Sequence, residues 1–268
     1  KSPFSLFLRV IVTLAAFITV AVLLFLVAYI VVMGVPNLGF LFELKFTSEN
    51  ASLLPALINT VIMTLMSLIV AVPIGIFSAI YLVEYAKRGN KLVGVVRITA
   101  ETLSGIPSIV YGLFGYLFFG VSLGWSYSMI GGALTMSIMN CPDYAYHRGG
   151  FDERAGLLPG SSFGLGAGKL RTVFRIILPS AMPGILSGII LGIGRIVGET
   201  AALMFTSGTV AQVAVNPMDS GRTLAVHMYN LLTGLAREAA YATAVILLIL
   251  VVGINALSSF VAKKFSKA

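Results

Sequence analysis

Charged residues are scarce in this 268-residue sequence: lysine, arginine, aspartate and glutamate make up 10%, whereas hydrophobic residues make up 58%. A soluble domain carries about 25% charged residues, so a single water-exposed core could not hide this much apolar surface. The single cysteine, Cys141, excludes an intramolecular disulfide and a cysteine metal cluster. The composition therefore predicts an all-α integral membrane protein, with lipid as its main solvent.

Six apolar segments come close to the roughly 20 residues that a membrane-spanning helix needs. They are residues 10–33, 54–83, 103–123, 128–142, 183–205 and 240–262. The fourth is the weakest, because its apolar stretch stops near Pro142. The first is too long for the apolar core of a signal peptide and has no clear cleavage site, so we expect a retained helix.

The net charge of +8 points to membrane orientation rather than to nucleic acid, because most basic residues flank the apolar segments. With the N-terminus inside, the cytoplasmic segments contain Lys1, Arg9, Lys87, Arg88, Lys91, Arg97, Arg148, Arg154, Lys169, Arg171, Arg175, Lys263, Lys264 and Lys267. The external segments contain Lys45, Arg222 and Arg237. We therefore expect a multi-pass protein of a prokaryotic cell membrane with both termini in the cytoplasm.

One glycine-rich stretch, residues 164–170, superficially matches a phosphate-cradling nucleotide loop. That loop needs four residues between its first glycine and the Gly-Lys pair, followed by serine or threonine. Only three residues lie between Gly164 and Gly168, and Leu170 follows the lysine. We expect no nucleotide site, no cofactor and no catalytic activity, so any ATP hydrolysis would belong to a separate subunit.

A second pattern in the same cytoplasmic segment begins at Gly166-Ala167 and reaches Leu178-Pro179 just before the fifth apolar segment. It resembles the coupling loop of ABC importer permeases. The resemblance implies that Gly166, Ala167, Lys169, Leu178 and Pro179 contact the ATPase subunit. The alternative is an amphipathic helix that lies among lipid headgroups.

Two charges lie inside the fifth apolar segment. Arg195 and Glu199 are four residues apart, which would place them on one face of a continuous helix. A charge at this depth costs at least about 2.5 kcal/mol, so the pair either neutralises itself or marks a substrate pathway. The pattern Gly-Arg-x-x-Gly-Glu-Thr closely resembles the signature of phosphate importer permeases, and implies that Arg195, Glu199 and Thr200 line the pathway. The fork of donors on arginine suits phosphate geometry.

A third pattern covers residues 101–113. Gly105 and Pro107 predict a break at the start of a helix, where Ser104 and Ser108 would face a pathway; a simple helix-entry turn is the alternative. The pattern is very similar to the phosphate permease family, as is most of the chain from 54 to 262. Residues 198–203 and 223–229 resemble the PstA branch of that family rather than the PstC branch. We interpret His227 as a surface or packing residue and not as a metal ligand.

The resemblance implies an ABC importer type-1 permease that carries phosphate. Its implied partners are a PstC-like second permease, a PstB-like ATPase dimer, a PstS-like extracytoplasmic phosphate-binding protein and membrane lipid, with no nucleic acid. The alternatives are a permease for another oxyanion, a secondary transporter or channel, and a degenerate, inactive permease. Inverted repeats would favour the secondary transporter, and the sequence contains none that we can identify.

The resemblance stops at Asn140 and returns at Phe163. The segment 141–162 lacks the coupling glutamate that the family carries three positions before Phe163. Back-translation from Asp143, read one nucleotide later, permits the family's own string, so we expect a frameshift; true divergence or a replaced loop are the alternatives. The predicted organisation is a first helix and external loop at 1–50, a permease domain at 51–262 and a cytoplasmic tail at 263–268.

Overall fold

A computed structural model describes residues 3–40, 51–81, 91–146, 168–234 and 236–266. Its elements are α1 (Pro3–Gly34), η1 (Val35–Phe40), α2 (Leu54–Ile80), α3 (Lys91–Ser104), α4 (Ser108–Gly115), η3 (Tyr116–Ser122), α5 (Met129–Tyr146), α8 (Lys169–Thr172), η4 (Val173–Ile177), α9 (Leu178–Gly198), α10 (Ala201–Thr206), α11 (Leu224–Thr233) and α12 (Arg237–Ser266). Within these ranges the chain has no strand, which confirms the all-α prediction.

The predicted spanning segments correspond to the apolar helices of the structure. Within the described parts of the chain, three helices are long and apolar enough to cross a bilayer: Phe4–Gly39, Leu54–Ser78 and Arg237–Phe260. A fourth candidate is broken into Gly94–Ser104 and Ser108–Ser122, which meet at 103°. Two shorter apolar helices, Met129–Cys141 and Gly184–Gly198, occupy the remaining two predicted segments.

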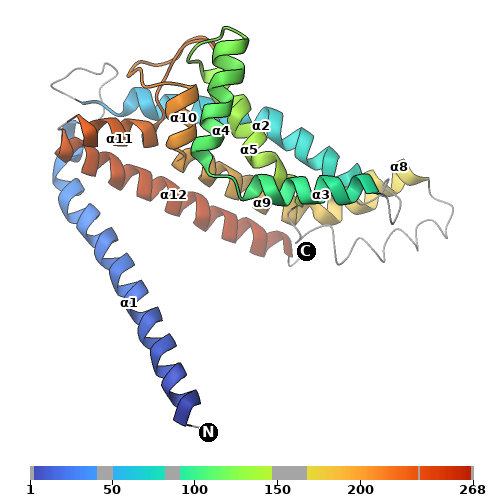
Figure 1. Ribbon diagram of the computed structural model, residues 1–268, viewed down its shortest axis with the longest axis horizontal. Coiled ribbons are helices and arrows are strands. Elements are labelled where there is room, and N and C mark those ends of the chain that lie inside the picture. Colours follow the sequence, from blue (N-terminus) through green and yellow to red (C-terminus); the bar gives the residue numbers. More distant parts are fainter. Residues whose placement is uncertain (1–2, 41–50, 82–90, 147–167, 235, 267–268) are drawn as a thin grey trace.

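Helix α1 stands away from the rest of the molecule (Figure 1). Its apolar side chains are exposed along most of its length, as expected for a helix surrounded by lipid. Only its end is held: Gly34 packs directly on the Tyr241 carbonyl of α12, and the Tyr29 and Tyr241 rings meet edge to face at 5.8 Å. This contact ties the N-terminal helix to the beginning of α12.

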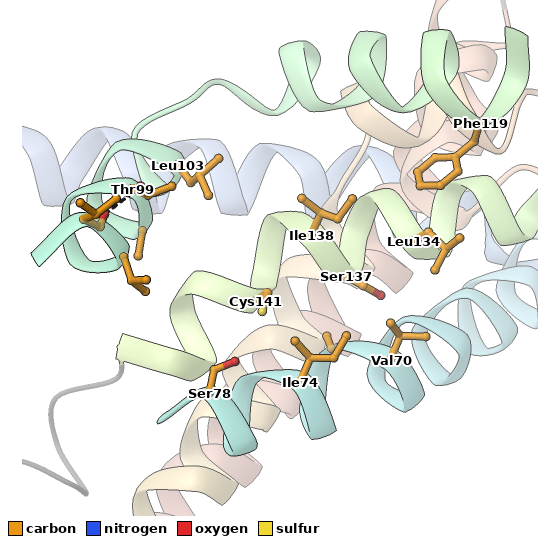
Figure 2. Close-up of a pocket in the computed structure, with 14 residues that line it drawn as sticks. Val70, Ile74, Ser78, Thr99, Leu103, Phe119, Leu134, Ser137, Ile138 and Cys141 are labelled. Carbon is orange, nitrogen blue, oxygen red and sulfur yellow. Dashed lines mark hydrogen bonds between the residues drawn. The ribbon is translucent and has the colours of Figure 1, made fainter. Parts of the chain in front are cut away.

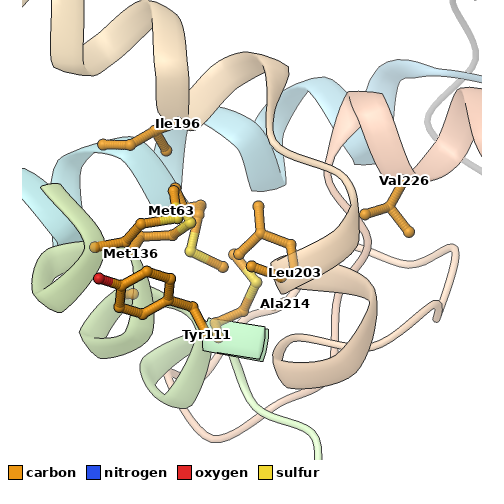
Figure 3. Packing of buried hydrophobic residues seen from close by; sticks show 11 residues of the cluster. Met63, Tyr111, Met136, Ile196, Leu203, Ala214 and Val226 are labelled. Atoms are coloured by element: carbon orange, nitrogen blue, oxygen red, sulfur yellow. The ribbon is translucent and has the colours of Figure 1, made fainter. Parts of the chain in front are cut away.

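The core contains an unusual share of methionine. Met63 of α2 and Met129, Met136 and Met139 of α5 are at most 1% exposed, and Figure 3 shows several of these side chains converging with Tyr111 and Leu203. Methionine is flexible and adapts to irregular gaps. Side chains in the core between α2, α4, α5, α9 and α10 could therefore rearrange at a modest cost in free energy.

The segment 207–223, between α10 and α11 (Leu224–Thr233), folds back over the bundle. Asn59 of α2 accepts a hydrogen bond from the Ala214 amide at 2.9 Å and donates to the carbonyls of Gln212 and Arg222. Thr60 accepts from the Leu224 amide at 2.8 Å. These bonds satisfy backbone groups that would otherwise be buried without partners.

The same segment closes the beginning of α5. The amides of Ser128, Met129 and Ile130 donate to the carbonyls of Thr206, Asp219 and Pro217, at 3.0, 3.0 and 2.8 Å. The first amides of a helix have no partner within the helix. Carbonyls that are distant in sequence therefore cap α5 and fix its position against the 207–223 segment.

One helix that the sequence predicts as continuous is divided into two in the structure. The fifth segment, 183–205, was expected to be a single helix, but α9 ends at Gly198 and α10 begins at Ala201. The prediction that Arg195 and Glu199 share one helix face is therefore also wrong. The physical reason is local: the Glu199 carboxylate accepts the Ala202 amide, and thus starts a new helix rather than continuing the old one.

Candidate translocation and coupling sites

The first break in the bundle separates α3 from α4, as Gly105 and Pro107 predict. The Tyr111 hydroxyl donates a 2.8 Å hydrogen bond to the Leu103 carbonyl, and the Ile106 amide donates to the same carbonyl at 3.1 Å. Unwound backbone is tolerated at membrane depth only where such partners satisfy it. The break is therefore a built feature that Tyr111 holds from the core.

The two predicted serines lie on either side of this break. Ser104 ends α3, is exposed, and donates to the Glu101 carbonyl at 2.8 Å. Ser108 is half-buried and begins α4 directly after Pro107. Ser108 is thus the better placed of the two to meet a ligand between helices.

The second break separates α9 from α10 at Glu199 and Thr200. Oε1 of Glu199 accepts the Ala202 amide at 3.0 Å, and the Thr200 carbonyl accepts the Met204 amide at 2.9 Å. A carboxylate at a helix N-terminus is favoured by the exposed amides and by the helix dipole. Glu199 therefore has a structural role in starting α10.

The short helices α4 and α10 lie side by side and run parallel (Figure 1). A methyl group on Gly112 would lie 2.7 Å from Cα of Ala202, and one on Gly115 would meet Thr206 at 2.9 Å. Gly112 and Gly115 of α4 thus face Ala202 and Thr206 of α10, so the two short helices pack closely. Each of them follows directly after one of the two breaks.

Arg195 lies in a different place. It is half-buried in the last turn of α9 and lines a cavity of about 400 Å³ between α9 and α12. The other polar side chain in this cavity is Asn255 of α12, and neither Ser104 nor Ser108 contributes to it. The predicted pathway residues therefore lie in different places: Arg195 beside α12, Ser108 at the break before α4, and Glu199 with Thr200 at the break before α10.

Sequence reasoning did not identify Asn255. The signal was available, because an amide inside the apolar segment 240–262 is as unusual in lipid as the arginine that was noticed. An asparagine is less conspicuous than a charge, and its proximity to Arg195 depends on how α9 and α12 pack.

A larger cavity, of about 580 Å³, opens between α2, α3 and α5 (Figure 2). Its lining is mostly aliphatic, with Ile74, Leu103 and Leu134 among the contributors and only hydroxyls such as Ser137 for polar groups. It contains no cation among its lining residues, so it is a poor site for an anion. The cavity beside Arg195 is the better candidate for a charged ligand.

The predicted coupling residues lie partly outside the described residues, since Gly166 and Ala167 belong to the gap before 168. Lys169 begins α8, and Leu178-Pro179 are the first residues of α9, which follows η4 directly. Between them, Thr172 is fully buried, and its amide and hydroxyl both donate to the Gly168 carbonyl.

This segment is packed against the end of α2. Val173 of η4 is 2% exposed and Ile80 of α2 is 6% exposed, and both form one apolar cluster with Ile76 and Leu178. A movement of α8 and η4 would therefore be transmitted to α2, which also carries Met63 of the central core.

A buried basic pair lies in α11 and just before it. His227 is fully buried and Arg222 is 6% exposed, so of the two expectations for His227, surface or packing, its burial favours packing. Burial, helped by the nearby charge of Arg222, lowers the pKa of His227 to about 3, although a hydrogen bond with the Ala51 backbone acts in the opposite direction. Burial also lowers the pKa of Arg222 to about 10, which leaves it charged at neutral pH.

Comparison with known proteins places the chain in context. Residues 71–267 match the family described as "Binding-protein-dependent transport system inner membrane component". The chain is 34% identical over 239 residues to "Probable ABC transporter permease protein YqgI" of Bacillus subtilis, covering 82% of this chain and 80% of the relative.

The names of two further relatives include the words phosphate transport system. "Phosphate transport system permease protein PstA 1" of Mycobacterium tuberculosis is 38% identical over 57% of this chain, which spans half of that relative's length. "Phosphate transport system permease protein PstA" of Mycobacterium leprae is 32% identical over 75% of this chain and 67% of its own length.

Solved structures support the fold. A MetNI methionine ABC transporter in an inward-facing conformation matches with a TM-score of 0.60 at 17% identity, over 80% of this chain and 94% of that one. A bacterial alginate ABC importer matches with a TM-score of 0.60 at 14% identity, over 92% and 96%. The chain therefore belongs to the binding-protein-dependent transport system inner-membrane component family, and has the fold of a type-1 ABC importer permease.

Proposed function

We propose that this chain is the PstA-type permease subunit of an ATP-driven phosphate importer. The observation that carries the proposal is Arg195, a guanidinium placed in a cavity of about 400 Å³ between two apolar helices. An arginine at membrane depth marks a pathway by default, and its planar donors match a tetrahedral oxyanion. The phosphate permeases among the relatives support phosphate as that oxyanion.

Phosphate would move past the two helix breaks as well as Arg195. Ser108, Glu199 and Thr200 lie where α4 and α10 begin, and unwound backbone there offers polar groups to a passing anion. Glu199 is a negative charge, so it would hasten the anion's departure rather than retain it. Ser104, being exposed beside the same break, completes the predicted set.

Coupling would run through the cytoplasmic segment. A PstB-like ATPase dimer would contact Gly166, Ala167, Lys169, Leu178 and Pro179, and its closure would move α8 and η4. The buried contact between Val173 and Ile80 would pass this movement to α2. A PstC-like permease would complete the membrane unit, and a PstS-like binding protein would deliver phosphate from outside.

The segment 141–162 bears on activity. We propose that it is a frameshifted reading of the coupling region, because the family pattern stops and restarts at its two ends. Resequencing the gene across the codons for 140–163 checks this. An intact family frame would restore the coupling glutamate, whereas confirmation of these residues would favour a degenerate permease.

Uptake of radiolabelled phosphate tests the function itself. The chain would be produced with its companion subunits in cells that lack their own phosphate permease. Phosphate uptake that depends on Arg195 supports the proposal. Uptake of sulfate or molybdate in place of phosphate would favour a permease for another oxyanion, and uptake without an ATPase would favour a secondary transporter.

A further inference from the structure

The cavity between α9 and α12 has two polar side chains, and only one of them has been considered so far. Gly188, Gly192 and Gly194 contribute no side chain to its wall, so Arg195 and Asn255 dominate its chemistry. A methyl group on Gly194 would lie 3.7 Å from Oδ1 of Asn255. The side-chain amide of Asn255 therefore reaches across to α9, where it lies beside Gly194, the residue before Arg195.

The position of Asn255 is costly unless the amide has a polar environment. It lies within the candidate span Arg237–Phe260 and is exposed on the surface of the described chain. Its backbone carbonyl accepts the Ser259 hydroxyl at 3.1 Å, but that bond does not involve the side-chain amide. An uncompensated amide is unfavourable in an apolar medium, so a hydrated, ligand-binding cavity is a better environment for Asn255 than lipid.

Arginine and asparagine have complementary abilities toward an oxyanion. A guanidinium provides charge and donors but no acceptor, whereas an amide provides two N–H donors and a carbonyl acceptor. Together they can meet the oxygens of a tetrahedral anion, including an oxygen that still carries a proton. Leu191 and Val251 complete the wall with apolar surface, which strengthens such polar contacts by lowering the local dielectric.

We propose that Asn255 binds the same oxyanion as Arg195, so that α12 contributes a specificity-determining residue to the pathway. The identification of the anion as phosphate rests on the proposed function; the shared site does not. While the anion is bound, it would hold α9 and α12 at a fixed spacing, because it contacts both helices.

The test is equilibrium binding of radiolabelled inorganic phosphate to membranes that contain the assembled transporter without its binding protein. Asn255→Leu keeps the approximate volume and removes the hydrogen bonds, so we expect the affinity to fall roughly tenfold. Asn255→Gln should recover part of the affinity. Val252→Ala, on the same helix but outside the cavity and 57% exposed, should bind phosphate like the wild type.

A double variant separates a shared ligand from two independent effects. If Arg195 and Asn255 contact one anion, then Arg195→Ala combined with Asn255→Leu should lose little more affinity than Arg195→Ala alone. Normal affinity in Asn255→Leu would overturn the proposal. The proposal would also be overturned if Asn255→Leu failed to assemble with the companion permease and Asn255→Gln recovered no affinity for phosphate. Asn255 would then be a packing residue.

Sulfate as a second probe distinguishes a failure of the proposed phosphate function from a failure of the proposed site. If sulfate but not phosphate binds, and its binding depends on both residues, the proposed phosphate function fails while the site of Asn255 and Arg195 stands. If neither anion binds to the wild type, the site itself is refuted.

Discussion

Gly112 of α4 lies so close to Ala202 of α10 that a methyl group on Gly112 would come within 2.7 Å of the Ala202 Cα atom. The obstacle is backbone, which cannot rotate away as a flexible side chain would. We therefore predict that Gly112→Ala separates α4 from α10 and destabilises the protein by about 1–3 kcal/mol. Because the helix breaks lie at the beginnings of these helices, phosphate uptake should fall as well.

Gly253→Ala provides the matched control. Gly253 lies in α12, and a methyl group there would meet nothing within 4 Å. Melting temperature in detergent and the yield of assembled complex measure both variants. Equal behaviour of Gly112→Ala and Gly253→Ala would show that the α4–α10 contact is looser than the structure indicates.

The buried imidazole of His227 predicts a dependence of stability on pH. Its pKa is about 3 in the folded protein, against an ordinary value of 6.5, so below pH 6.5 the unfolded chain binds a proton that the folded protein does not. Acidification therefore favours unfolding, and the stability is fully present only above pH 6.5. Between pH 7.5 and 5.5 the loss should be about 1 kcal/mol.

His227→Gln tests the assignment, since glutamine keeps a polar side chain of similar reach but does not titrate in this range. Melting temperatures of wild type and variant would be compared at both pH values. The variant should lose less on acidification than the wild type, whatever its own stability at pH 7.5. An identical loss in both proteins would assign the acid sensitivity to other groups.

The buried contact between Val173 and Ile80 predicts a coupling defect. Val173→Ala leaves a gap in the apolar cluster that joins η4 to α2, at a cost of about 1–2 kcal/mol. If this contact transmits ATPase closure, phosphate transported per ATP hydrolysed should fall severalfold while ATP hydrolysis persists. Ile80→Ala should reproduce the defect, because it removes the other half of the same contact.

Val215→Ala serves as the control, because Val215 is 84% exposed in the 207–223 segment. Its transport and hydrolysis should match the wild type. If Val173→Ala lowered hydrolysis and transport in the same proportion, Val173 would support folding and would have no specific role in coupling.

The spans and one of the breaks could be predicted from the sequence because their signals are local. Length and hydropathy indicate the apolar helices, and Gly105 with Pro107 indicates the bend between α3 and α4. The break after Gly198 was missed, because the helical spacing of Arg195 and Glu199 suggested continuity. The break depends on the hydrogen bond that the Ala202 amide donates to the Glu199 carboxylate, and only the folded geometry reveals this bond.

The remaining features depend on residues that are far apart in the sequence. Asn59 joins the 207–223 segment through bonds that span more than 150 residues, and no periodicity encodes such a contact. Asn255 and Arg195 line one cavity only because α9 and α12 pack against each other. Such pairings follow from how the helices pack, which the pattern of a single helix does not contain.

The central claim is that Arg195 binds phosphate on its way through the membrane. The most direct measurement is the initial rate of phosphate uptake by Arg195→Ala, with assembly of the complex checked by co-purification of the companion subunits. Uptake should fall at least about tenfold in an assembled complex, since a lost charged hydrogen bond is worth roughly 1.5–3 kcal/mol. Arg195→Lys should retain part of the activity, because lysine keeps the charge without the planar fork. Uptake at the wild-type rate in an assembled Arg195→Ala complex would contradict the account.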